Sequence, residues 1–140
     1  AILLDTNGYV AEGTGENVFL VRDGILYTPG PPSEILMGVT RDSVLRIARD
    51  LGLECVERLI SVNELLTADE VFFSGTYAEV APVREIGRHQ VGNGKTGPVT
   101  REIVTRYMRI VHGEDPNYGD WLTPVPAASK ASPPVARARR

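Results

Sequence analysis

Two stretches of the chain repeat apolar residues at the spacing of one helix face. In the first, the positions i, i+3, i+4 and i+7 are filled by Val44, Ile47, Ala48 and Leu51. This repeat predicts an amphipathic helix that begins near Thr40 and ends before Gly52, which suits the left-handed position after a helix. The opposite face is expected to carry the polar residues Arg41, Asp42, Arg46 and Arg49. A second helix is predicted from Pro98 to about Val111, closed by Gly113.

The rest of the chain is dominated by short apolar runs of strand type. The predicted strands are Ile2–Leu4, Tyr9–Ala11, Asn17–Arg22, Ile25–Thr28, Leu53–Ile60, Val71–Ser74 and Ala78–Ile86. Asn-Gly and Asp-Gly pairs predict hairpin turns between the first two strands and between the next two, because they accept positive φ. The prolines of Thr28–Ser33 predict a loop, and Pro82 predicts an edge or bulged strand. Ser61 and Glu64 match a capping box for a short helix through Leu66.

The order of these elements, β-β-β-β-α-β-α-β-β-α, is not the alternation of a parallel α/β fold. It predicts an α+β fold, with helices packed on a largely antiparallel, barrel-like sheet. At 140 residues the chain has the length of about one domain. Ala1–Asp5 already has the pattern of a buried strand, so we expect the chain to begin in mid-fold. Pro124–Arg140 is rich in Pro, Ala and Arg and is expected to be a disordered tail, with a basic contact arm as the alternative.

Composition narrows the functions to consider. The net charge of −3 gives no case for binding nucleic acid, and no apolar run approaches the ~20 residues of a membrane span. Cys55 is the only cysteine, which rules out an intrachain disulfide and fits a reducing compartment. His89 and His112 lack metal-ligand spacing and are expected to be solvated or structural. The two lysines, Lys95 and Lys130, lie in polar segments without the apolar pocket that Schiff-base chemistry favours.

A glycine-rich stretch, "EGTGENVFLV" (Glu12–Val21), has the look of a phosphate-binding loop. It matches neither the P-loop nor the dinucleotide-binding pattern, and a strand follows it where those motifs need a helix. Glu12 and Glu16 would repel a phosphate. The loop is therefore a poor phosphate site, and its two carboxylates call for another explanation.

Two other turns are better placed to bind an anion. "MGVT" leads into the first long helix, where Gly38 lets the backbone approach closely and Val39 and Thr40 offer N–H groups at the positive helix end. Ser74–Thr76 is a turn of small residues after a buried strand. The spacing alone favours simpler roles, an N-cap for Thr40 and an ordinary turn for Ser74–Thr76.

These stretches resemble a known family. The branched-chain aminotransferases, which are fold-type IV enzymes that use pyridoxal 5'-phosphate (PLP), have consecutive signatures similar to "YVAEGTGENVFLV", "YTPGPPSEILMGVTRDSV", "ADEVFFSGTYAEVAPVREI" and "GPVTREI". The resemblance runs from Ile2 to about Pro124, in the family's order and spacing. It implies transamination of Leu, Ile or Val with 2-oxoglutarate. It also implies a cytoplasmic homo-oligomer that binds small-molecule substrates and neither nucleic acid nor a membrane.

The resemblance also implies a role for individual residues. Glu12 matches the acid that pairs with the protonated pyridine nitrogen, and Glu16 and Asn17 match residues that support it. The remaining cofactor contacts are Leu36 against the ring, and Gly38, Val39, Thr40 and Thr76 at the phosphate. The amides of Tyr77 and Ala78 match the turn that receives the substrate α-carboxylate. Tyr77 replaces the small residue that is frequent there in the family. This change is expected to affect which substrate side chains the site prefers.

One element of the family's site has no counterpart here. The lysine that forms the Schiff base with PLP lies upstream of the segment resembled, and neither Lys95 nor Lys130 matches it. Residues 1–123 are therefore expected to be the larger, C-terminal, PLP-binding domain, without catalytic residues of its own and inactive in isolation. The alternatives are a D-amino-acid aminotransferase or aminodeoxychorismate lyase of the same fold, or a non-catalytic domain used for assembly.

Overall fold

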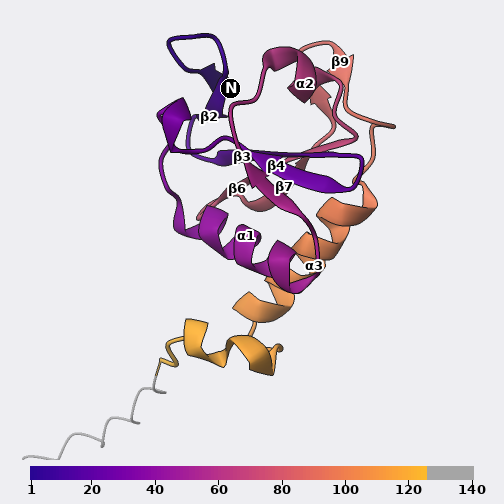
Figure 1. The fold of residues 1–140 in the computed structure, drawn as a ribbon. Coiled ribbons are helices and arrows are strands. Elements are labelled where there is room, and N and C mark those ends of the chain that lie inside the picture. Colours follow the sequence, from indigo (N-terminus) through magenta and orange to yellow (C-terminus); the bar gives the residue numbers. More distant parts are fainter. Residues whose placement is uncertain (126–140) are drawn as a thin grey trace, which may run out of the picture.

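The computed structural model describes residues 1–125 (Figure 1). Its strands are β1 (Ile2–Leu4), β2 (Val10–Gly13), β3 (Asn17–Arg22), β4 (Ile25–Thr28), β5 (Cys55–Glu57), β6 (Glu70–Gly75), β7 (Glu79–Val83), β8 (Glu85–Ile86) and β9 (His89–Gln90). Its helices are α1 (Val39–Asp50), α2 (Val62–Leu66) and α3 (Pro98–Val111), with 3-10 turns at Pro31–Ser33 and Pro116–Trp121. None of the helices in this part of the chain is long and apolar enough to cross a membrane. The predicted tail lies outside the described residues from position 126 onward.

The centre of the fold is a five-stranded sheet in the order β5-β4-β3-β6-β7. Its pairs are antiparallel except β4 with β5, which confirms the α+β, largely antiparallel prediction. The predicted barrel is wrong for the described residues, because β5 and β7 end the sheet without pairing. Five strands are few for closure, and Pro82 gives β7 a residue that cannot donate to a further strand.

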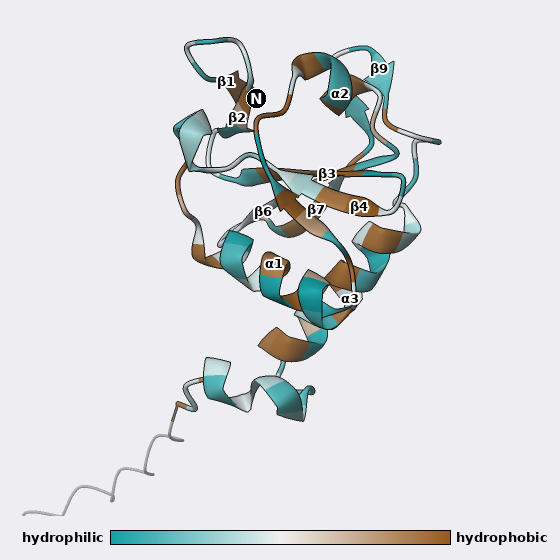
Figure 2. Ribbon diagram, viewed as in Figure 1, coloured by the Kyte–Doolittle hydropathy of each residue, from teal (hydrophilic) through white to brown (hydrophobic). Residues whose placement is uncertain are grey.

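Both faces of this sheet are covered, which explains the unbroken apolar run of β3. Phe19 and Val21 point to the side of α1 and α3, and Phe19 stacks on Phe72 of β6 with ring centroids 4.9 Å apart. Val18 and Leu20 point to the opposite side, toward α2 and β2. The hydropathy colouring shows apolar strands between helices with polar outer faces (Figure 2). The sheet is thus a rigid layer, and its strand ends can hold a site.

Helix α1 differs from its prediction at one position. Its predicted apolar residues Val44, Ile47 and Ala48 are fully buried, as expected. Arg41, predicted on the polar face, is only 2% exposed. Its Nη2 donates to the carbonyl oxygen of Pro29 at 2.9 Å and to Glu57 Oε2 at 2.6 Å. The polar-face prediction was wrong because these partners lie on other elements and let a charged side chain be buried.

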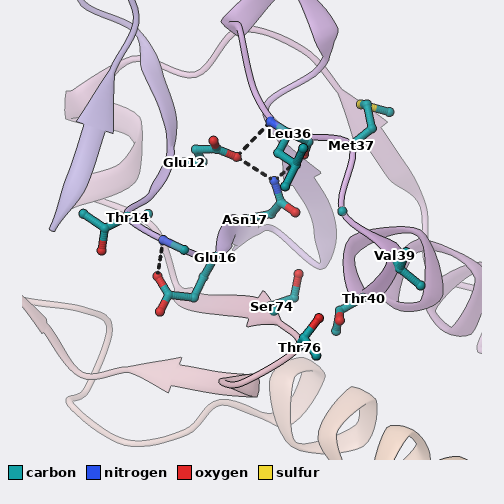
Figure 3. Close-up of a pocket in the computed structure, with 14 residues that line it drawn as sticks. Glu12, Thr14, Glu16, Asn17, Leu36, Met37, Val39, Thr40, Ser74 and Thr76 are labelled. Carbon is teal, nitrogen blue, oxygen red and sulfur yellow. Dashed lines mark hydrogen bonds between the residues drawn. The ribbon is translucent and has the colours of Figure 1, made fainter.

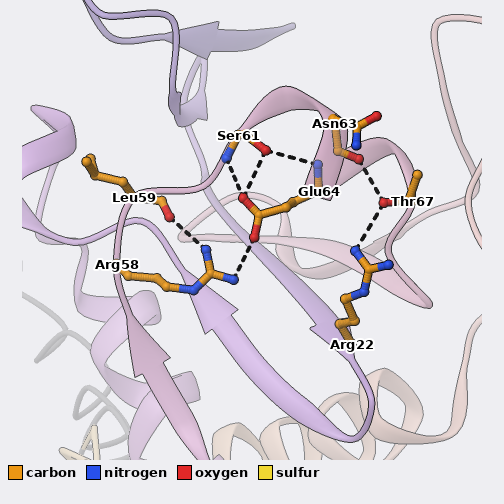
Figure 4. Close-up of polar contacts among 7 residues, drawn as sticks. All are labelled: Arg22, Arg58, Leu59, Ser61, Asn63, Glu64 and Thr67. Carbon is orange, nitrogen blue, oxygen red and sulfur yellow. Dashed lines mark hydrogen bonds and ion pairs between the residues drawn. The ribbon is translucent and has the colours of Figure 1, made fainter.

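A second arginine supports the capping box of α2 (Figure 4). The Ser61 side chain accepts from the Glu64 amide and the Glu64 side chain accepts from the Ser61 amide, as predicted. Arg58 Nη2 also donates to Glu64 Oε1 at 2.8 Å. This bond, together with the Ser61 amide, lowers the pKa of Glu64 to about 2.

Helix α3 is capped by a residue from the sheet. Glu70, at the start of β6, is 6% exposed and accepts from the amides of Val99 at 3.1 Å and Thr100 at 2.7 Å. A carboxylate at this end is favoured by the helix dipole. Gly97 is required beside it, because a Cβ at that position would collide with the Glu70 side chain. This long-range cap anchors α3 to the same strand that ends in the Ser74–Thr76 turn.

Candidate functional site

Three distant segments enclose a cavity of about 430 Å³ (Figure 3). They are the turn between β2 and β3, the segment that leads into α1, and the end of β6. The lining residues are Glu12, Gly13, Thr14, Gly15, Glu16, Asn17, Leu36, Met37, Gly38, Val39, Thr40, Ser74, Gly75 and Thr76. The acidic glycine loop and both anion-binding turns singled out from the sequence therefore meet at one place.

Glu12 is held by two hydrogen bonds to one of its oxygens. Its Oε2 accepts from Asn17 Nδ2 at 3.0 Å and from the Leu36 amide at 3.0 Å. Asn17 Nδ2 donates its other hydrogen to the carbonyl oxygen of Leu36 at 2.8 Å. The three residues form a closed network that orients the Glu12 carboxylate at the cavity and ties the loop before α1 to β3.

The glycines of the acidic loop allow segments to pack closely. At Gly13 a Cβ would lie 2.7 Å from Glu16 Oε2, and at Gly75 it would lie 3.1 Å from the Gly15 carbonyl oxygen. The end of β6 therefore approaches the loop backbone more closely than a larger residue would permit. Glu16 Oε2 also accepts from the Gly15 amide at 3.2 Å, so this carboxylate is engaged within its own loop.

The N-terminus of α1 faces the cavity. Its N-cap is Gly38, with extended backbone, so the interpretation of Thr40 as the N-cap is wrong. Thr40 lies in the first turn and is 8% exposed. In the part of the chain that the structure describes, the amides of Val39 and Thr40 have no hydrogen-bond acceptor. A Cβ at Gly38 would collide with Asn17 Oδ1, which is why the chain needs glycine here.

Only some residues at the end of β6 and in the turn after it line the cavity. Ser74 and Thr76 line it, and Ser74 is fully buried. Tyr77 is fully exposed, and neither Tyr77 nor Ala78 lines the cavity. Of the ten site residues implied by resemblance, the structure brings eight together and leaves these two at the adjacent turn.

Sequence reasoning did not identify every neighbour of this site. Thr14 and Met37 line the cavity, and Tyr107 of α3 lies beside Thr40. Burial raises the pKa of the Tyr107 hydroxyl, the Glu79 carboxylate raises it further, and the contact with Thr40 lowers it. The helical spacing of Tyr107 indicated burial, but nothing in the sequence placed its hydroxyl near Thr40.

Other candidate groups lie elsewhere. His89 and His112 are exposed, and residues 1–125 contain no group of three His, Cys, Asp or Glu side chains that could hold a metal ion. Cys55 is half-buried, and burial raises the pKa of its thiol. Lys95 is exposed in the loop before α3, away from the cavity. Lys130 lies outside the described residues.

Comparisons with known proteins identify the family to which the sequence is similar. A family model described as amino-transferase class IV matches residues 1–86. The chain is 48% identical over 124 residues to a branched-chain-amino-acid aminotransferase of Salmonella typhimurium, covering 89% of this chain and 40% of the relative. A probable branched-chain-amino-acid aminotransferase of Aquifex aeolicus is 48% identical over 126 residues, with the same coverage. The chain thus spans about 40% of the length of these curated relatives.

Solved structures extend the comparison. A T.th. branched-chain amino acid aminotransferase complexed with N-(5'-phosphopyridoxyl)-L-glutamate superposes with a TM-score of 0.85 at 50% identity, covering 88% of this chain and 42% of that one. The PLP-form of the enzyme from Thermobaculum terrenum gives a TM-score of 0.88 at 47% identity, covering 91% of this chain and 42% of that one.

Proposed function

The chain belongs to the class IV aminotransferase family, and from this premise we propose that it supplies the PLP-binding part of a branched-chain amino-acid aminotransferase. The complete enzyme would exchange the amino group of Leu, Ile or Val for the oxo group of 2-oxoglutarate. The named relatives and the ligands of their solved structures support this substrate class and cofactor. Because the chain spans about 40% of those relatives, the activity is proposed for the complete enzyme.

The proposal rests on the different chemical groups at the two ends of the cavity. One side offers the Glu12 carboxylate, and the other offers the N-terminus of α1 with Thr40 and Thr76 (Figure 3). PLP has a matching polarity, with a protonated nitrogen on its ring and a phosphate on an arm. The carboxylate suits the cation, and unpaired amides at a helix N-terminus suit the dianion. The donor set of this chain therefore fits the cofactor.

The cavity residues that the resemblance implies would then have defined tasks. Glu12 would accept a hydrogen bond from the pyridine nitrogen and keep it protonated, while Asn17 and the Leu36 amide hold the carboxylate in place. Val39 and Thr40 would donate their amide N–H groups to the phosphate, and Thr76 would donate its hydroxyl. When bound, PLP supplies the electron sink for the carbanion formed at the substrate α-carbon.

The supporting residues orient the ring and the substrate. The Leu36 side chain is 73% exposed at the cavity rim, where a ring would cover it. Gly38 admits the close backbone approach, and Glu16 accepts from the Gly15 amide within the same loop. We propose that the amides of Tyr77 and Ala78 receive the substrate α-carboxylate beside the cavity.

The resemblance implies a lysine that forms the Schiff base with PLP, and residues 1–125 place no lysine in the cavity lining. Lys95 is exposed and remote from the cavity lining. We propose that the lysine and the second wall of the pocket come from an N-terminal domain of the complete enzyme, and that residues 1–123 form its C-terminal domain. Cytoplasmic location and homo-oligomeric assembly remain predictions from the resemblance.

Substrate profiling of the protein from the complete coding region tests the proposal. We expect amino transfer from Leu, Ile and Val to 2-oxoglutarate, little from D-Ala, and none with the 140-residue chain alone. Glu12→Gln should lower kcat at least about tenfold, because it removes a charge-assisted hydrogen bond to the ring. Faster transfer from D-Ala than from Leu would assign the chain to the D-amino-acid branch of the fold instead.

A further inference from the structure

One buried polar group in the cavity is not used by the proposed site. Ser74 is 0% exposed, and its Oγ has no hydrogen-bond partner within residues 1–125. Burying a hydroxyl without a hydrogen-bond partner is unfavourable, because the group loses its bonds to water. Ser74 also lines the cavity, so a ligand bound there could supply the missing partner.

The position of Ser74 shows which way its hydroxyl faces. Side chains alternate along a strand, so Ser74 lies on the same side of β6 as Phe72, which packs against Val44 and Leu45 of α1. Ser74 is therefore on the α1 side of the sheet, paired in register with Asn17 of β3. Figure 3 shows its hydroxyl directed into the cavity, on the side of Thr40 and Thr76.

The surroundings identify the kind of ligand. The unpaired amides of Val39 and Thr40 mark the positive end of α1, and Thr40 and Thr76 add hydroxyls at the same end of the cavity. All of these groups can donate to the oxygen atoms of one anion. A phosphate has enough acceptor oxygens to satisfy each donor at once.

We propose that the Ser74 hydroxyl is a further phosphate ligand of this cavity, donating from the sheet side to the group that the α1 amides bind. Where the phosphate is that of PLP, the inference rests on the proposed function. The phosphate contact itself does not require aminotransferase activity.

The test compares two cofactor forms in two variants. PLP and pyridoxal, which lacks the phosphate, are titrated by visible absorbance against the protein from the complete coding region. Ser74→Ala should weaken PLP binding about ten- to a hundredfold, the loss of one hydrogen bond to a charged group. Pyridoxal binding should stay within about twofold of its original value.

Ser33→Ala is the matched control. Ser33 is also 0% exposed with an unpartnered Oγ, but it does not line the cavity. Its removal should leave the affinity for PLP unchanged. An equal loss of PLP and pyridoxal affinity in Ser74→Ala would overturn the inference, because the hydroxyl would then act on the ring or the fold. Unchanged PLP affinity would overturn it as well.

Inorganic phosphate separates the inference from the proposed function. If the protein binds neither PLP nor pyridoxal, the proposed function fails, and phosphorus NMR of the same protein with inorganic phosphate decides the inference. A phosphate shift that is saturable in the original protein and lost in Ser74→Ala would support the inference. Absence of binding, or equal binding in both, would overturn it.

Discussion

Replacing Asn17 by aspartate removes the N–H groups that bind Glu12 and the Leu36 carbonyl oxygen, with little change in side-chain volume. Both hydrogens of Asn17 Nδ2 are used, at 3.0 Å to Glu12 Oε2 and 2.8 Å to the Leu36 carbonyl oxygen. An introduced carboxylate would face two acceptors at these distances. The substitution therefore isolates the donor role of the amide.

The magnitude follows from the two bonds. A hydrogen bond to a charged group contributes about 1.5–3 kcal/mol and a neutral one about 1 kcal/mol. Asn17→Ala removes both, and because Glu12 is half-buried we expect the lower end, about 2–3 kcal/mol of unfolding free energy. Asn17→Asp adds repulsion between like charges and should cost about 1–2 kcal/mol more at pH 7.

Urea denaturation at pH 7 and pH 4 measures both effects. At pH 7 the midpoint of Asn17→Asp should fall by about 1.5–2.5 M, at a urea slope of about 2 kcal/mol per M. The neighbouring Glu12 carboxylate raises the pKa of the introduced carboxyl, so this destabilisation grows as pH rises and shrinks as pH falls. If Asn17→Asp is no less stable than Asn17→Ala at pH 7, or unfolds at the original midpoint, the network does not hold Glu12 as described.

Substitutions at two further residues test the anchors of the helices. Glu70→Ala should destabilise the chain by about 2 kcal/mol, because the Val99 and Thr100 amides lose their acceptor. Glu70→Gln keeps one side-chain oxygen as an acceptor and should cost less. Equal losses of stability for the two variants in urea denaturation would contradict the role of Glu70 as the cap of α3. The folded pKa of Glu64 is lowered from 4.5 to about 2, so its contribution is present above pH 4.5 and is lost as pH falls toward 2. Glu64→Gln should flatten the stability of the chain over that range, and an unchanged pH profile would contradict the role of Arg58 and Ser61.

Local patterns predicted most of the elements. The α1 and α3 repeats, the hairpin turns and the Ser61 capping box all appear in the structure, because each depends on neighbours within a few residues. The predicted strand Leu53–Ile60 shortened to Cys55–Glu57, where pairing with β4 decides its length. The predicted strand Ala78–Ile86 is divided into β7 and β8 in the structure, while β9 and the turn at Pro116–Trp121 lacked an apolar period that could predict them.

The errors came from contacts between distant residues. The burial of Arg41 depends on Pro29 and Glu57, and the cap of α3 depends on Glu70, which lies 29 residues before Val99. The same holds for Ser74. Its turn was recognisable from the sequence, but its lack of a partner follows from how β3, β6 and α1 pack together. Side-chain burial of this kind cannot be predicted from spacing.

Binding of PLP tests the central claim most directly. The measurement is a titration of PLP, followed by its visible absorbance, against this chain supplied with the N-terminal portion from its coding region. The account predicts a saturable spectral change that inorganic phosphate competes away and that Glu12→Gln alters. A protein that gives no saturable change with both portions present would contradict the account and favour a non-catalytic role for the fold.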